Sequence, residues 1–333
     1  MAGRVQIRDV AQRAGVSIGT VSNVINGLGT VKARNVERVE QAMAELGFVP
    51  NSHARQLRTG RGDAIGLVVL SVSNPFYAEI AHVAETFAEE HGSTIVIGSS
   101  DHDEAREQRY IDLFEASRSR GLLVAPVSGI TPRLLEVRRR GTPVVLLHEH
   151  VSADDFCSVS LDGVAGGYLA CRHLIDIGRR RIALVGGPVS QISDRVSGAS
   201  QAIREAADSV LTFLETTDLS VEEGREAANR ILALPRDERP DAVFGANDTV
   251  ALGVLQEFIL RGIKVPQDIA LIGYDDIDFA ATAIVPLSSV AQPREQIARE
   301  AIRLLIDEER EGSHTHEQAL LVPELVVRAS TTG

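Results

Sequence analysis

Residues 12–27 read QRAGVSIGTVSNVING, a short helical pattern that lies between two glycine turns. Gly15 can end one helix in a left-handed conformation, and Ser17 suits the N-cap of the next helix. Two short helices joined by a tight turn form a helix-turn-helix, whose second helix enters the major groove of DNA. Both helices are predicted to turn a small or apolar face inward, formed by Ile7, Val10, Ala11 and Ala14 in the first and by Val21, Val24 and Ile25 in the second.

A third helix is predicted over residues 33–46. Its apolar side chains would close a small three-helix core, and they are Val36, Val39, Ala42, Met43 and Leu46. The sequence therefore predicts an all-α helix-turn-helix head at the N-terminus. The second helix carries almost no charge, which suits short polar side chains that approach bases closely while basic neighbours hold phosphates.

The charge of the chain is divided unevenly. The whole sequence has a net charge of −12, yet residues 1–62 hold nine Lys or Arg against four Asp or Glu, so the remainder carries −17. A basic terminal module is typical of proteins that bind polyanions, because lysine and arginine displace counterions from phosphates. A solvated basic surface would give the same count, so charge alone leaves nucleic-acid binding open.

The sequence favours a reducing compartment. No apolar run reaches the roughly 18 residues that cross a bilayer, and the N-terminus MAGRVQIRDV lacks the apolar stretch of a signal peptide. Cys157 and Cys171 show neither metal-ligand spacing nor the density of a disulfide framework. We therefore expect a cytoplasmic, nucleoid-associated protein in which both cysteines are structural.

From residue 64 onward, short apolar strands alternate with helical stretches. A first set reads AIGLVVL, TIVIGSS, GLLVAPV and PVVLLH, and a second set reads RIALVGG, VLTFLET, DAVFGAN and IALIGYD. Such alternation is typical of parallel sheets that helices cover on both faces. Two sets predict an α/β body of two lobes with parallel sheets and a ligand cleft at the C-terminal ends of the strands.

Longer motifs point to a family. The run DVAQRAGVSIGTVSNVING, followed by ERVEQAMAELGFVPNSHARQL, IGLVV and SNPFYAE, resembles the lac repressor (LacI/GalR) family of bacterial transcription regulators. The segments RRRIALVGGP, AVFGANDTVALGVL, VPQDIALIGYDD and LSSVAQPREQIAREA extend the resemblance over nearly the whole chain. It implies a ligand-responsive repressor that binds a pseudo-palindromic operator in double-stranded DNA and is controlled by a small polar effector such as a sugar.

The resemblance also implies the domain organisation of a periplasmic-binding-protein-like regulator. A DNA-binding domain over 1–48 precedes a hinge helix and linker over 49–62 and an effector-binding and dimerisation domain over 63–333. The chain is expected to cross between the lobes near residues 162, 292 and 322. The N-lobe would then comprise about 63–161 and 293–321, and the C-lobe about 162–292 and 322–333. No heptad helix follows, so we expect a homodimer rather than a tetramer.

In the family, the first positions of the recognition helix read bases, and neighbouring positions touch phosphates or brace the helix. Ile18, expected to be exposed, could contact a thymine methyl, and Asn23 could pair with adenine. Gln6 and Lys32 stand at helix starts where the family usually has Thr and Ser, so weaker caps are expected. The matching positions in this head are Ser17, Ile18, Gly19, Thr20, Ser22, Asn23 and Asn26.

The hinge segment FVPNSHARQLRTGRGD is too short to form a stable helix alone. In the family it folds on the operator, where a leucine wedges open the minor groove and kinks the DNA. Leu57 matches that leucine, and Asn51, Ala54 and Arg55 match its neighbours. In the free protein a flexible linker is the expected state.

The resemblance places the effector site on residues at strand ends and lobe crossings. Carboxylates and amides pair with vicinal hydroxyls, arginine supplies a planar fork, and an aromatic face stacks on a sugar ring. Arg195 is matched only through its R-x-x-G spacing to Gly198, and His148 stands where many members have Asp. The expected set is Phe76, Tyr77, His148, Asp162, Arg195, Asn247, Asp248, Asp275 and Gln292.

Other interpretations are weaker. No G-x-G-x-x-G follows the first strand, and the sequence lacks a nucleophile elbow and a catalytic carboxylate pair, so an enzyme is not expected. A solute-binding protein would share the body's fold, but the basic head and the missing signal peptide disfavour it. His148, Glu149 and His150 resemble a metal cluster, yet adjacent strand residues point to opposite faces. The sequence therefore predicts no metal site and no cofactor.

Overall fold

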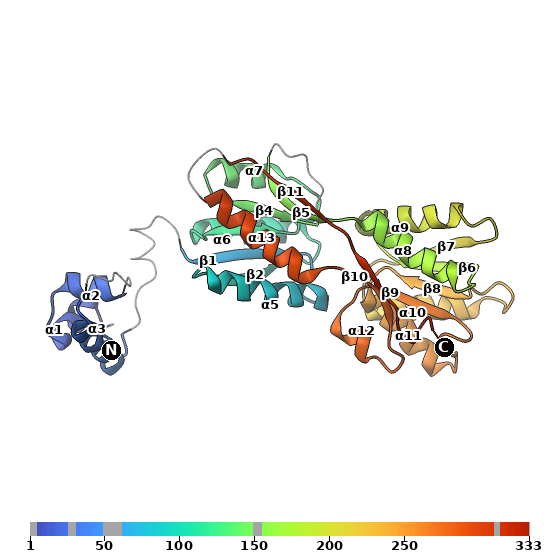
Figure 1. The fold of residues 1–333 in the computed structure, drawn as a ribbon, viewed down its shortest axis with the longest axis horizontal. Coiled ribbons are helices and arrows are strands. Elements are labelled where there is room, and N and C mark those ends of the chain that lie inside the picture. The colour runs from blue at the N-terminus through green and yellow to red at the C-terminus, as the bar shows by residue number, and fades with distance from the viewer. Residues whose placement is uncertain (1–4, 26–30, 49–61, 149–154, 310–313, 333) are drawn as a thin grey trace. The chain divides into compact units, whose positions relative to one another are not determined.

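The computed structural model describes residues 5–25, 31–48, 62–148, 155–309 and 314–332 of the chain. Two compact units make up the protein, Met1–Gly62 and Asp63–Gly333 (Figure 1). Several residues named above lie outside the described ranges, and they are Asn26, Asn51, Ala54, Arg55, Leu57, Glu149 and His150.

The N-terminal unit is a three-helix head, as the sequence predicts. Gly15 ends the first helix with a φ of 63°. The hydroxyl of Ser17 caps the second helix by accepting a hydrogen bond from the backbone N–H of Thr20 at 3.1 Å. The helices are therefore joined by the tight turn of a helix-turn-helix, and they are α1 (Ile7–Ala14), α2 (Ile18–Ile25) and α3 (Ala33–Leu46).

The core of the head takes one fully buried valine from each helix, Val10, Val21 and Val39. Because α2 turns Val21 inward, Ile18 at its start is left on the outer face. Ile18 is 52% exposed, which confirms the exposure expected for this side chain.

The starts of α1 and α3 differ in their capping hydrogen bonds. At α1, the carboxylate of Asp9 accepts a hydrogen bond from the N–H of Gln6 at 2.7 Å. At α3, the side chain of Lys32 makes no capping hydrogen bond with any described residue. The weak cap expected at Lys32 is therefore confirmed, and α3 relies on its apolar face for stability.

The larger unit holds two six-stranded sheets, each the centre of one lobe. In the N-lobe the order is β11-β5-β4-β3-β1-β2, and every adjacent pair is parallel. Parallel pairing brings the C-terminal ends of all six strands to one edge of the sheet. The strands are β1 (Ala64–Val69), β2 (Thr94–Ser99), β3 (Gly121–Val124), β4 (Val144–Leu147), β5 (Cys157–Leu161) and β11 (Gln318–Leu321).

In the C-lobe the strand order is β12-β10-β9-β8-β6-β7. Its strands pair in parallel, except that β12 lies antiparallel to β10. The same repeated strand–helix pattern therefore gives the two lobes matching sheets. The strands are β6 (Arg181–Gly186), β7 (Val210–Glu215), β8 (Ala242–Gly245), β9 (Ala270–Asp275), β10 (Ser288–Ala291) and β12 (Glu324–Val326).

Helices cover both faces of each sheet, which confirms the predicted fold class. In β1, Ile65 and Leu67 belong to a buried cluster with α5 and α13, whereas Val68 belongs to one with α6 and α7. None of the helices that the structure describes could span a membrane. The N-lobe helices are α5 (Pro75–Glu90), α6 (Glu104–Ala116), α7 (Pro132–Arg139) and α13 (Arg294–Glu309), and the C-lobe helices are α8 (Gly163–Asp176), α9 (Val189–Arg204), α10 (Val221–Ala233), α11 (Asp248–Leu260) and α12 (Asp278–Thr282).

The chain passes between the lobes three times (Figure 1). It leaves β5 at Leu161 to enter α8, leaves β10 at Ala291 to enter α13, and leaves β11 at Leu321 to enter β12. Because three connections join the lobes, they can move relative to each other chiefly by a hinge motion.

Two glycines allow α8 and α9 to pack closely. A Cβ atom at Gly167 would overlap the backbone carbonyl oxygen of Arg195, and one at Gly198 would overlap that of Val164. Neither glycine needs its backbone freedom, because both lie in regular helix. Their role is to let the two helices approach, and this approach fixes the position of Arg195.

This packing predicts that Gly198→Ala destabilises the protein. Alanine improves helix propensity by about 1 kcal/mol, but the methyl group collides with backbone that cannot rotate away, so overpacking of roughly 1–3 kcal/mol dominates. Urea denaturation should show a lower free energy of unfolding for the body. Ser197→Ala, at the exposed neighbouring position on α9, is the matched control and should leave stability unchanged or slightly higher, because alanine is the better helix former. Equal stability of the two variants would show that the helices are not in tight contact.

Candidate functional site

A cavity of about 630 Å³ lies between the lobes, at the C-terminal ends of the strands. This volume is in the range of pockets that hold small molecules. Loops from both sheets line it, as the two-lobed fold requires. The residues expected at the site that line it are Phe76, Tyr77, His148, Arg195, Asn247, Asp275 and Gln292.

Asp275 is the last residue of β9 and is nearly completely buried, with 2% exposure. Gln292 Nε2 donates a hydrogen bond to Oδ1, and Asn74 Nδ2 donates one to Oδ2 at 3.3 Å. Burial raises the pKa of this carboxyl, while the guanidinium of Arg195, 4.0 Å from Oδ1, acts in the opposite direction. Asn74 belongs to the N-lobe, so this one carboxyl group joins the two lobes.

Arg195 is held in place by two contacts at the ends of C-lobe strands. Its guanidinium carbon lies 4.1 Å from the centroid of the Tyr274 ring, a cation–π arrangement. Its Nη1 also donates a hydrogen bond to the backbone carbonyl of Ala246. The arginine therefore presents a fixed positive charge to the cavity.

Phe76, Tyr77 and His148 form an aromatic cluster on the N-lobe side. Their ring centroids lie 5.4 to 5.7 Å apart. Burial, helped by the positive charge of Arg195, lowers the pKa of His148 to about 4. The imidazole is therefore neutral at physiological pH, with one nitrogen able to donate a hydrogen bond and the other able to accept one.

Three buried polar atoms around the cavity have no hydrogen-bond partner among the described residues. They are Nε2 of His148, Oγ1 of Thr249 and Oε1 of Gln292. Most buried polar atoms in folded proteins are paired, so unpaired atoms require an explanation. Their presence around one cavity indicates a site that receives donors and acceptors from a polar ligand or from water.

The backbone beside the cavity is strained. His102, His148 and Asp275 line the cavity and have positive φ angles of 57°, 61° and 101°. Non-glycine residues adopt this region at a cost of about 1–3 kcal/mol each, and such residues cluster at functional sites. The strain agrees with a site whose side chains are held in set directions.

Two expected site residues do not line the cavity, which corrects the expectation for both. Asp248 is fully buried, and its carboxylate accepts hydrogen bonds from Ser289 Oγ at 2.6 Å and from the Ile277 N–H at 2.9 Å. It lies at the start of α11 with its side chain turned toward β10, so it braces the C-lobe. Asp162 caps α8 by accepting a hydrogen bond from the Ala165 N–H at 2.8 Å.

The sequence did not single out several residues that join the lobes at the cavity. Besides Asn74, the side chain of Gln191 contacts that of His102, with 3.0 Å between Nε2 and Nδ1. Asn74 carries a local signal, because it precedes Pro75 and caps α5 by accepting a hydrogen bond from the Phe76 N–H. No local sequence pattern marks Gln191 or His102, since only the folded lobes bring these two residues together.

The low pKa of His148 predicts acid sensitivity. The unfolded chain takes up this proton near pH 6.5 and the folded chain only near pH 4. The stabilisation is therefore complete above about pH 6.5 and is lost as the pH falls toward 4, by up to roughly 3 kcal/mol. Urea denaturation between pH 4 and 7 should show a shallower loss of stability in His148→Gln than in the wild type.

The matched control is His82→Gln, which changes an exposed histidine on α5 and should follow the wild-type pH curve. An NMR titration that places the His148 ring near pH 6.5 in the folded protein would contradict the prediction.

Comparison with known proteins agrees with this architecture. Residues 6–51 match the model for bacterial regulatory proteins of the lacI family, and residues 171–331 match that for a periplasmic binding protein-like domain. The chain is 35% identical over 334 residues to the HTH-type transcriptional regulator DegA of Bacillus subtilis (strain 168), and the match covers 98% of each chain.

Solved structures give the same result. The lac repressor dimer bound to operator and the anti-inducer ONPF is 26% identical, with a TM-score of 0.83, and the match covers 99% of this chain and 100% of that one. The complex of the transcriptional regulator CelR with cellobiose is 30% identical, with a TM-score of 0.70, over 98% of this chain and 100% of that one. A helix-turn-helix head on a two-lobed body, matched over the full length of such relatives, identifies this chain as a member of the lacI family of bacterial regulatory proteins.

Proposed function

We propose that this regulator is a repressor, which binds a pseudo-palindromic operator as a homodimer and takes a small polar effector in the cleft between its lobes. The observation that carries the effector site is the set of unpaired buried atoms on His148, Thr249 and Gln292 around one cavity. A ligand with several hydroxyl groups would supply the missing partners. With operator DNA as its target, the protein would act in the cytoplasm, on the nucleoid.

A sugar suits the chemistry of the cleft better than an apolar molecule. Asn247 and Gln292 offer amide groups, Arg195 offers a guanidinium fork, and the ring cluster at Phe76 offers an aromatic face. The neutral imidazole of His148 can bind a hydroxyl without requiring a charged ligand. The relative CelR has been solved with cellobiose, which supports the sugar class for this chain.

The head is the part of the chain that is proposed to bind the operator. Ile18 stands exposed at the start of α2, where it could contact a thymine methyl, and Asn23 could pair with adenine one turn later. The proposed DNA-binding set is the one implied by the family resemblance, Ser17, Ile18, Gly19, Thr20, Ser22, Asn23 and Asn26 in the head and Asn51, Ala54, Arg55 and Leu57 in the hinge. Homodimer symmetry would place two heads on the two half-sites.

Contacts that cross the cleft give the effector a way to act on the operator. Asn74 bonds Asp275, and Gln191 contacts His102, each joining the N-lobe to the C-lobe. A ligand that bonds to these groups changes the balance between more open and more closed arrangements of the lobes. We propose that residues 49–62 carry this change to the heads. The effector and the operator would then each change the affinity of the protein for the other.

A thermal-shift screen of sugars, polyols and nucleobases on the full-length protein tests the effector class. A sugar or polyol should raise the melting temperature in a concentration-dependent way, since a ligand that binds only the folded state stabilises it. Stabilisation by nucleobases alone would overturn the sugar class but keep the cleft as the site. Compounds that stabilise the protein then enter an operator titration.

We predict that Asp275→Ala loses its response to the effector while still binding the operator. Removal of a charged partner from a buried hydrogen bond costs about 1.5–3 kcal/mol, or roughly one to two decades in affinity. Fluorescence anisotropy of a labelled operator, with and without the compound, measures both properties. Asp278→Ala is the matched control, because Asp278 is close in sequence but its side chain is 86% exposed. A wild-type response in Asp275→Ala would mean that this residue only closes the end of β9.

A second prediction concerns the hinge. Leu57→Ala should weaken binding to the specific operator by a few kcal/mol, because an apolar wedge no longer supports the kinked base step. Affinity for non-specific duplex and for the effector should not change, and both serve as controls in the same anisotropy and calorimetry experiments. Unchanged operator affinity would show that residues 49–62 act only as a tether.

A further inference from the structure

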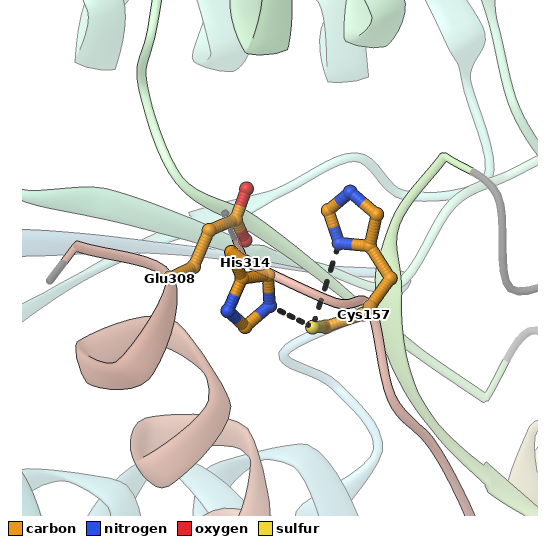
Figure 2. Close-up of side chains that lie close together, drawn as sticks. Cys157, Glu308 and His314 are labelled. Carbon is orange, nitrogen blue, oxygen red and sulfur yellow. Dashed lines mark hydrogen bonds between the residues drawn. The ribbon is translucent and has the colours of Figure 1, made fainter. Parts of the chain in front are cut away.

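A cluster of side chains that could hold a metal ion lies in the N-lobe, away from the effector cleft. Cys157 is the first residue of β5, Glu308 lies in the last turn of α13, and His314 and His316 precede β11. One donor atom from each lies within 4.8 Å of the others. Figure 2 shows how the side chains of Cys157, Glu308 and His314, from separate parts of the chain, converge.

The hydrogen bonds show which atoms of the cluster carry protons when no ion is bound. Cys157 Sγ lies 3.0 Å from Nε2 of His314 (Figure 2). The same sulfur lies 3.7 Å from Nδ1 of His316. Nη2 of Arg138 donates to Nε2 of His316 at 2.8 Å, so the neutral ring carries its proton on Nδ1, facing the sulfur. The Cys157 thiol can then donate only to His314.

The two printed distances from the sulfur to the ring nitrogens are close to those of a tetrahedral zinc site. Zinc–sulfur and zinc–nitrogen bonds of about 2.3 and 2.0 Å place tetrahedral ligands about 3.5 Å apart. The two sulfur–nitrogen distances, 3.0 and 3.7 Å, lie on either side of this value. The donor atoms all lie within 4.8 Å of one another, so side-chain movements would still have to bring the four around one ion.

We propose that Cys157, Glu308, His314 and His316 bind one Zn²⁺ ion. One thiolate, one carboxylate and two imidazoles match the ligands that zinc prefers, and the two negative charges balance those of the ion. On binding, the thiol proton of Cys157 leaves to solvent, and the proton of His316 moves from Nδ1 to Nε2. The guanidinium of Arg138 then turns away from that ring and keeps its bond to Asp155, which it already makes at 2.9 Å.

Neighbouring groups would support the sulfur as a ligand. The backbone N–H of Glu317 donates to Cys157 Sγ at 3.5 Å, as a group around a metal thiolate commonly does. Cys157 is completely buried, so the sulfur is protected from exchange with solvent thiols. The other three ligands are partly exposed, which leaves the ion a path of entry.

The ion would tie together three segments, of which the start of β5 is far in sequence from the other two. It would join the end of α13 to the start of β5 and to the chain that enters β11, the strand from which the third lobe crossing departs. None of the four ligands lines the effector cavity, and Cys157 is at the opposite end of its strand. Zinc would therefore stabilise the N-lobe without competing with the effector.

The test uses the untagged, reduced, full-length protein after treatment with a chelator. Isothermal titration should give one Zn²⁺ per chain, and a thermal melt should rise by several degrees at saturating Zn²⁺. Co²⁺, used as a spectroscopic probe, should give the sulfur-to-cobalt charge-transfer band and the intense visible bands of a tetrahedral site. A wild-type protein that binds neither ion, or that shows no sulfur band with Co²⁺, would overturn the proposal.

Variants assign the ligands. Cys157→Ala should abolish the sulfur band, and both it and His314→Gln should weaken zinc affinity at least about 100-fold. Cys171→Ala, at the other buried cysteine, and His82→Gln, at an exposed histidine, are matched controls that should bind like the wild type. If circular dichroism shows that Cys157→Ala does not fold, the zinc affinity of His314→Gln and the cobalt spectrum of the wild type test the proposal instead. A sulfur band lost in Cys171→Ala and kept in Cys157→Ala would place the ion elsewhere.

Discussion

The buried carboxyl group of Asp275 is the constraint on which the cleft depends. A carboxylate removed from water is costly unless nearby charges and donors replace its hydration. Gln292 at a lobe crossing, Asn74 on the N-lobe and Arg195 on α9 supply that replacement. The carboxyl group of Asp275 therefore holds three segments in place. Because Asn74 lies on the N-lobe and Gln292 at a lobe crossing, a change in the arrangement of the lobes must alter the surroundings of this carboxyl group. A ligand that binds at this position would therefore be physically linked to movement of the lobes.

Packing elsewhere in the lobes makes this arrangement possible. Parallel strands bring their C-terminal ends to one edge of each sheet, so the loops that carry the polar groups meet there. The close contact of α8 with α9, permitted by Gly167 and Gly198, places Arg195 over Tyr274. At the other end of the N-lobe sheet, Cys157 and its three neighbours form a separate polar cluster. The two ends of one sheet thus have different chemistry, one suited to a sugar and one to a metal ion.

The sequence predicts the fold from local pattern, and the family resemblance then places part of the site on that fold. Strand ends are visible as apolar runs that stop at a polar residue, and the family resemblance assigned Asn247 and Asp275, which stand at such ends, to the cavity. The same rule failed for Asp248, since the first turn of α11 directs its side chain to Ser289 instead. Contacts such as Gln191 with His102, and Cys157 with His314, join segments that no spacing relates. Only the folded chain brings such residues together.

If the cleft controls DNA binding, a cleft ligand and the operator must change each other's affinity by the same factor. The most direct measurement is the affinity of the full-length protein for a screened ligand, by calorimetry, with and without saturating operator duplex selected from a random library. We expect the ligand affinity to change by about 5- to 150-fold, equal to the ligand's own effect on operator affinity. A ligand affinity that is the same with and without operator would contradict the coupling.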